Sequence, residues 1–152
     1  MNFPEDAVAG ILARWPVARL ALLDAEGEPR QLPIVFAPSA GALWSPVDGK
    51  PKRSAALARL RLLEREPRVS LLLDHYTDDW TRLWWLELRG RAELVRADAE
   101  ADPRIAAPAA ALRAKYPQYA TTPLFLGPPT LVRITVASTR GWAASGVLGT
   151  PI

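Results

Sequence analysis

The chain has 152 residues, of which 49% are hydrophobic and 23% are charged, with a formal net charge of +3 and no cysteine. This length suits a single domain, and the hydrophobic fraction excludes a disordered protein. The absence of cysteine excludes a disulfide scaffold, a thiolate metal site and a cysteine nucleophile.

The distribution of apolar and charged residues narrows the class of protein further. No apolar run approaches the roughly 20 residues that a membrane-spanning helix needs. Residues 1–14 lack the basic and apolar regions of a signal peptide. We therefore expect a cytoplasmic protein with no membrane span. The sequence pI of 9.7 reflects a charge excess that is too small to indicate a nucleic-acid partner.

In chain order, the sequence predicts a helix, three strands, a helix, two strands, a helix and a last strand. Val8, Ile11 and Leu12 recur at helical spacing within residues 1–14. The predicted strands are bounded by turn residues or proline and cover 18–24, 31–37, 42–47, 68–74, 83–95 and 130–139. The two later helices cover 51–66 and 98–116. Residues 140–152 are expected to form an irregular tail.

Three residues predict irregularities in these elements. Pro33 has no amide proton, so its strand is expected to lie at a sheet edge or to carry a bulge. Gly90 lies in the middle of a long alternating strand and predicts a bulge or a bend there. Pro108 is expected to break the helix over residues 98–116.

The short hairpins and the bent long strand favour a small closed barrel over a sandwich. The predicted fold class is mainly β with helices (α+β), built around a six-stranded antiparallel barrel. One domain is expected to hold the whole of residues 1–152, with the N-terminal helix at 1–14, the barrel at 15–139 and the tail at 140–152.

The strongest chemical signal lies where the helix over residues 51–66 begins. The chain has only three lysines, and two of them, Lys50 and Lys52, flank Pro51 just before Arg53. A helix N-terminus carries free N–H groups and partial positive charge, so cations there are unfavourable unless an anion lies among them. A phosphate suits such a site, held by the N–H groups, both ammonium groups and the guanidinium. The alternative is a solvated basic face. The lack of interleaved aromatic residues argues against a nucleic-acid surface.

Residues 74–85 combine acidic and aromatic side chains with the only histidine, His75. One histidine among loop carboxylates is a weak signal for a metal site, and no serine has the context of a hydrolase nucleophile. The neighbouring Trp84 and Trp85 point to opposite faces of a strand, so one is expected in the core and the other against a partner or ligand. Trp80 is expected to stack on a planar ring or to enter a subunit interface.

The sequence resembles the pyridoxamine 5′-phosphate oxidase-like split β-barrel superfamily. More narrowly, it is similar to probable deazaflavin (coenzyme F420)-dependent oxidoreductases of actinobacteria. The resemblance covers residues 15–96. It rests on the stretches 18–24, 32–36, 47–53, 74–80 and 84–92.

The resemblance implies a split barrel that forms a homodimer with two shared cofactor sites. The cofactor phosphate is implied to lie by the third strand and the following helix start, at Ser45, Val47, Lys50, Pro51, Lys52 and Arg53. The ring is implied to lie along the second strand, at Pro33, Ile34, Val35 and Phe36. An aromatic residue from the second copy, Trp80 or Trp84, is implied to close the pocket.

The implied activity is that of an F420H2-dependent reductase, which transfers hydride between the deazaflavin and a small conjugated organic substrate. An FMN-dependent oxidoreductase of the same fold and a non-catalytic F420-binding carrier are the alternatives. The recognisable pyridoxal phosphate-binding residues of the oxidase itself are missing, so vitamin B6 oxidation is not expected. Arg53, Arg59 and Arg140 are candidates to hold the polyglutamate tail of F420.

Overall fold

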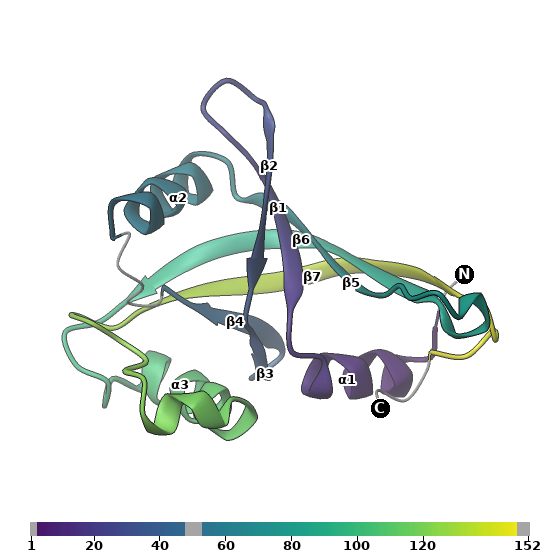
Figure 1. Cartoon of the computed structure of the whole chain (residues 1–152). Coiled ribbons are helices and arrows are strands. Elements are labelled where there is room, and N and C mark those ends of the chain that lie inside the picture. The colour runs from purple at the N-terminus through teal and green to yellow at the C-terminus, as the bar shows by residue number, and fades with distance from the viewer. Residues whose placement is uncertain (1–2, 48–52, 149–152) are drawn as a thin grey trace.

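The computed structural model describes residues 3–47 and 53–148, in which seven strands form one antiparallel sheet with the order β2-β1-β5-β6-β7-β4-β3 (Figure 1). The strands are β1 (Ala18–Leu23), β2 (Pro29–Ile34), β3 (Ala37–Ser39), β4 (Ala42–Pro46), β5 (Arg68–His75), β6 (Trp84–Arg96) and β7 (Thr130–Ala143). Figure 1 shows β1 and β2 crossing the long ribbon that β6 and β7 form. The predicted α+β class with an antiparallel sheet is confirmed.

The two edge strands of the sheet are consecutive in the chain. Strand β2 ends at Ile34 and β3 begins at Ala37, so only Val35 and Phe36 join the two edges. Three peptide steps span at most about 11 Å, and the sheet must therefore coil until its edges meet. The barrel is closed here by the chain itself rather than by a ladder of hydrogen bonds. We call Val35–Phe36 the seam.

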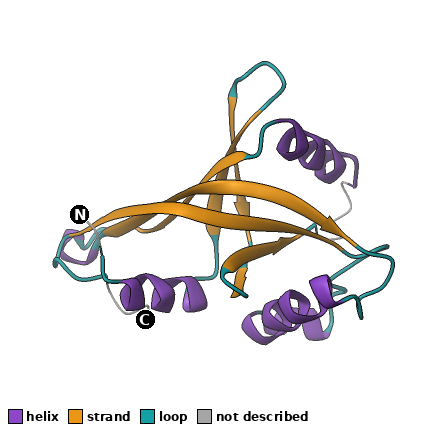
Figure 2. Cartoon of the chain, turned by 180° about the vertical axis from the view of Figure 1, so that it is seen from behind, coloured by secondary structure: helices purple, strands orange, loops and turns teal. Residues whose placement is uncertain are grey.

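The described residues also form three α-helices and two short 3₁₀-helices. They are α1 (Glu5–Arg14), α2 (Arg53–Arg65), η1 (Trp80–Arg82), α3 (Pro103–Lys115) and η2 (Pro117–Ala120). Figures 1 and 2 show α2 beside the upper part of the barrel, with α1 and α3 along its lower side. No helix within residues 3–47 and 53–148 is long and apolar enough to cross a membrane.

Alternate strand positions supply the core. On β6, Trp84, Leu86 and Leu88 point inward, and each is at most 3% exposed. This row packs with the inward residues of β1 and β5 and with α1 and α2. A second cluster joins α3, through Ile105 and Leu112, to β3, β4 and the start of β7.

Two local predictions about the strands are confirmed. Strand β2, which contains Pro33, lies at an edge of the hydrogen-bonded order. The register of β6 with β7 shifts at Gly90, because Arg89 lies opposite Ser138 whereas Gly90 lies opposite Val136. This bulge bends the long ribbon at the residue that has no side chain.

The number of strands is seven rather than the predicted six. The predicted strand over residues 31–37 is two strands, β2 and β3, because the seam interrupts the ladder. A tight turn at Ala40 and Gly41, with φ of 50° and 74°, then returns the chain into β4. Positive φ at both central residues is the geometry of a type I′ hairpin turn.

The ends of the last strand and the last α-helix also differ from prediction. Strand β7 continues to Ala143, which pairs with Trp84, so part of the expected tail is a strand. Pro108 does not break α3, which runs through it to Lys115. A proline removes one helical hydrogen bond, and the fully buried face that surrounds Pro108 holds the helix together across that gap.

Candidate functional site

The seam, which is part of the predicted cofactor strand, is held by side chains instead of a ladder. The Ser45 hydroxyl donates to the carbonyl oxygen of Val35 over 2.8 Å. The Phe36 amide donates to the Tyr116 hydroxyl over 3.0 Å. The Lys115 ammonium donates to the Phe36 carbonyl oxygen over 2.8 Å. These contacts satisfy backbone groups of Val35 and Phe36, which have no partner in a ladder of strands and would otherwise be unpaired.

Lys115, at the end of α3, and the adjacent Tyr116 also reach the last turn of α1 and the segment that follows it. The Lys115 ammonium donates to the Leu12 carbonyl oxygen over 2.9 Å, and the Tyr116 hydroxyl lies 2.8 Å from the Pro16 carbonyl oxygen. The Lys115 nitrogen is 3.6 Å from the centroid of the Phe36 ring, in a cation–π arrangement. The end of α3, the end of α1 and the seam therefore meet at one point, which we call the seam clamp.

Burial changes the acid–base properties of the seam clamp. It lowers the pKa of Lys115 to about 8, and burial is the only cause of that shift. Burial also raises the pKa of Tyr116, which the hydrogen bond with Phe36 partly opposes. The surroundings of both side chains thus favour their uncharged forms. The Lys115 ammonium is bound by carbonyl oxygens rather than by a carboxylate.

We expect the free energy of unfolding to rise with pH between about 8 and 10. Below pH 8 the amine of Lys115 is protonated in both states, because its folded pKa is about 8 and its ordinary value is 10.5. Above pH 8 the folded chain has released a proton that the unfolded chain still holds, so raising the pH favours folding. Urea unfolding across this range measures the rise. Lys115→Met is expected to flatten it, and an equal slope in the variant would contradict the assignment.

The four predicted ring residues differ in accessibility. Pro33 is exposed, Ile34 and Val35 are half-buried, and Phe36 is fully buried. Within the described chain, the side chains that reach the surface here are therefore those of Pro33, Ile34 and Val35. Phe36 acts in the core and through its backbone.

The predicted phosphate residues fall into two groups. Ser45 is 5% exposed, and its hydroxyl proton is used at the seam. Val47 is half-buried against the core, and its amide donates to the Thr130 carbonyl oxygen over 3.3 Å. The others lie outside the described part of the chain: Lys50, Pro51, Lys52 and the side chain of Arg53.

The tryptophans of residues 74–85 are separated by burial. Trp84 is 3% exposed and meets the Trp15 ring edge-on at 4.7 Å, which confirms that one of the neighbouring pair fills the core. Trp85 is half-buried on the outer face of β6. Trp80 is 77% exposed in η1, whose first turn is capped by Asp79. Of the two predicted closing residues, Trp80 is the accessible one.

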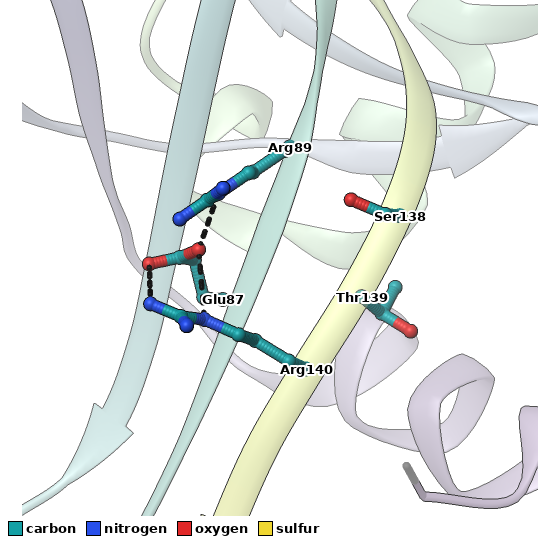
Figure 3. A pocket seen from close by; sticks show the side chains of 5 residues that line it. All are labelled: Glu87, Arg89, Ser138, Thr139 and Arg140. Atoms are coloured by element: carbon teal, nitrogen blue, oxygen red, sulfur yellow. Dashed lines mark hydrogen bonds and ion pairs between the residues drawn. The ribbon is translucent and has the colours of Figure 1, made fainter. Parts of the chain in front are cut away.

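The outer face of β6 and β7 carries a shallow pocket of about 200 Å³ (Figure 3). Its lining residues are Glu87, Arg89, Ser138, Thr139 and Arg140. Figure 3 shows the Glu87 carboxylate between two guanidinium groups, at 2.7 Å from Nε of Arg89 and 3.2 Å from Nε of Arg140. Partial burial raises the pKa of Glu87, but the two arginine hydrogen bonds outweigh it and hold that pKa below its ordinary value.

The apolar part of the same outer face lies directly beside the pocket, and the Arg140 guanidinium is 5.9 Å from the centroid of the Trp85 ring. Trp85 and Trp142 form a directly opposed cross-strand pair, and Leu72 lies on neighbouring β5. Leu72 is 38% exposed and Trp142 is 39% exposed. Among residues 3–47 and 53–148, no group of three or more His, Asp or Glu side chains is placed to hold a metal ion.

Sequence reasoning missed Lys115 and Tyr116. Their partners lie 79 to 103 positions away in the chain, so no local pattern relates them to the seam. The one signal was composition, because Lys115 is the only lysine besides Lys50 and Lys52 in a chain that otherwise uses arginine.

The chain is similar to known proteins in both sequence and fold. The family model described as pyridoxamine 5′-phosphate oxidase matches residues 4–143. No curated protein matches the sequence significantly.

Three solved structures illustrate how widely the fold is shared. The conserved hypothetical protein Rv2991 from Mycobacterium tuberculosis is 23% identical, with a TM-score of 0.72 over 100% of this chain and 91% of that one. HutZ, described as a heme storage protein from Vibrio cholerae, is 17% identical, with a TM-score of 0.67 over 91% and 93%. An FAD-binding protein from Mesorhizobium loti is 20% identical, with a TM-score of 0.63 over 91% and 94%. At these identities the likeness establishes the fold.

Proposed function

This chain belongs to the pyridoxamine 5′-phosphate oxidase family, and from that premise we propose that it is a cytoplasmic oxidoreductase with a flavin-type cofactor. The observation that carries the proposal is the family match over residues 4–143, which takes in the whole barrel. Cofactors of this kind carry the redox chemistry themselves, so the protein has to bind the ring, orient it and exclude water.

We propose coenzyme F420 as that cofactor and a small conjugated organic molecule as its hydride-exchange partner. The support is the resemblance of residues 15–96 to deazaflavin-dependent oxidoreductases, together with the cationic helix start at Lys50, Lys52 and Arg53. When bound, the deazaflavin supplies or accepts hydride. The chain's part is to hold the phosphate at the start of α2 and the ring along β2.

The accessible residues at the end of β2 and in the seam suit a flat, largely apolar ligand. The exposed Pro33 and the half-buried Ile34 and Val35 offer apolar surface. A ring that binds there removes this surface from water, which is favourable. Trp80 is 77% exposed and free to stack. We therefore propose Trp80, and not the buried Trp84, as the aromatic residue that closes the pocket of a second copy.

FMN is the second candidate cofactor. The likeness to a protein described as FAD-binding favours a true flavin, and FMN likewise has a phosphate on its ribityl chain and a flat three-ring system. The likeness to HutZ makes heme a third ligand to test. The only histidine, His75, is half-buried, with its ring 6.0 Å from that of Trp15.

A homodimer belongs to this proposal, since the site implied by the family is shared between two copies. The outer sheet face supports it, because Leu72, Trp85 and Trp142 leave apolar surface on an otherwise charged ribbon. Exposed apolar surface of this kind is typical of a protein interface.

The experiment is a titration of the purified protein with F420, FMN, FAD and hemin, followed by fluorescence or absorbance. We expect saturable binding of F420 at one molecule per chain, with weaker binding of FMN. Light scattering on the same sample is expected to give twice the 16.6 kDa of one chain. Tight FMN or FAD binding without F420 binding would select the second candidate. Binding of hemin alone, or of none of the four, would refute the proposed oxidoreductase.

A further inference from the structure

The seam needs partners that the sheet does not supply. Val35 and Phe36 belong to no strand, yet they connect the two edges of the barrel. Their backbone groups are met by side chains of β4 and of the end of α3. The position of this link, and with it the end of β2, is therefore set by those side chains.

The hydrogen bonds at the seam fix the backbone of Phe36 on both sides of the residue. The Tyr116 hydroxyl accepts from the Phe36 amide and also lies 2.9 Å from the Phe36 carbonyl oxygen. That carbonyl oxygen receives the Lys115 ammonium as well. Both polar backbone groups of the buried Phe36 are thus fixed by the adjacent residues Lys115 and Tyr116.

A lysine is energetically unfavourable at this position, because burial disfavours its charged form. Its nitrogen is held by two carbonyl oxygens and lies over the Phe36 ring, and no charged group contributes to the shift of its pKa. The Tyr116 phenol, whose pKa is raised by burial, is a neighbouring titratable group at the same helix end. Burying an ammonium without a carboxylate costs free energy, so an apolar residue would serve packing better. What lysine adds is a directional hold on the Phe36 carbonyl group.

We propose that Lys115 and Tyr116 are positioning residues for the cofactor. They fix the seam backbone and with it the end of β2, along which the ring is proposed to lie. This inference rests on the proposed function, since it concerns the same site. It adds Lys115 and Tyr116, which are remote in sequence, to the determinants of cofactor affinity.

The test compares Lys115→Met and Tyr116→Phe with a matched control, Leu112→Ala. Leu112 is fully buried on the same helix and belongs to the core cluster that Tyr116 joins, so its truncation destabilises α3 while keeping the side-chain groups that bind Val35 and Phe36. We expect both seam variants to bind F420, or FMN if that is the ligand, about tenfold more weakly, as the loss of a hydrogen bond to a charged or buried group predicts. The control is expected to bind as the wild type does at a temperature where all four proteins are folded.

A second measurement reads the seam without any cofactor. Hydrogen exchange of the Phe36 amide is expected to be faster in Tyr116→Phe, because this variant lacks the hydroxyl that accepts from that amide. The variant loses a single oxygen atom, so it is expected to fold. Lys115→Arg, which keeps a positive donor, is expected to restore affinity to within a few-fold of the wild type.

The outcomes separate this inference from the proposed function. If wild-type protein binds none of the ligands, the proposed function fails and this inference falls with it. If the wild type binds but the seam variants bind equally well, or if Leu112→Ala weakens binding as much as they do, only the positioning role is refuted.

Discussion

Replacing Gly90 by alanine is expected to destabilise the protein by about 3 kcal/mol or more, or to prevent folding. A Cβ atom at this position overlaps the carbonyl oxygen of Thr135 and lies 2.9 Å from its carbonyl carbon and 3.1 Å from the Cα of Val136. These are backbone atoms of β7, beside the register shift, and they move only if the two longest strands of the barrel separate. The measurement is urea or thermal unfolding followed by circular dichroism.

Gly10→Ala is the matched control for this substitution. Gly10 lies in α1, and a Cβ atom there meets only the guanidinium group of Arg14, at 3.3 Å. That side chain is long and can move aside. Alanine favours a helix over glycine by about 0.5–1 kcal/mol, so this variant is expected to be as stable as the wild type or more so. Equal stability of Gly90→Ala and wild type would show that β6 and β7 do not approach as described.

Replacing Lys50 and Lys52 together by alanine is expected to weaken cofactor binding at least tenfold. Hydrogen bonds from a charged group contribute about 1.5–3 kcal/mol each, and two ammonium groups on one phosphate would both be lost. Titration of the double variant with the cofactor that the wild type binds gives the dissociation constant directly.

The control for the lysine pair removes the same amount of positive charge from α2 itself. Arg61→Ala with Arg65→Ala takes two positive charges from exposed positions further along α2. If general electrostatic attraction explains binding, both double variants weaken it equally. If the helix start holds the phosphate, only Lys50 and Lys52 matter. An unchanged dissociation constant in the lysine variant would remove both residues from the site.

The parts of the fold that the sequence predicts correctly are those that depend on neighbouring residues. Pro33 indicates an edge strand because it lacks a donor, and Gly90 indicates a bulge because it lacks a side chain. Pro108 misleads for the same reason, since the local rule that proline breaks helices ignores the buried packing around it. The seam is out of reach of local patterns, because it exists only when β2 and β3 occupy opposite edges of one sheet.

The candidate site divides along the same line. The sequence singles out Lys50 and Lys52 through spacing, and Trp80 through its place in a polar loop. It does not distinguish the exposed Trp80 from the buried Trp84, because burial depends on what packs against the strand. It gives Lys115 no role, since the carbonyl groups that hold Lys115 come from the first quarter of the chain.

The seam also bears on the order in which the molecule is made. Phe36 leaves the ribosome 79 residues before Lys115 and 80 residues before Tyr116. Until then the backbone groups of Phe36 can bind only water, and one edge of the barrel stays open. Contacts of such long sequence separation form slowly, and an exposed edge is prone to association with other chains. A nascent chain that stops short of residue 115 therefore lacks the partners of the seam, and the sheet itself is complete only when β7 has followed.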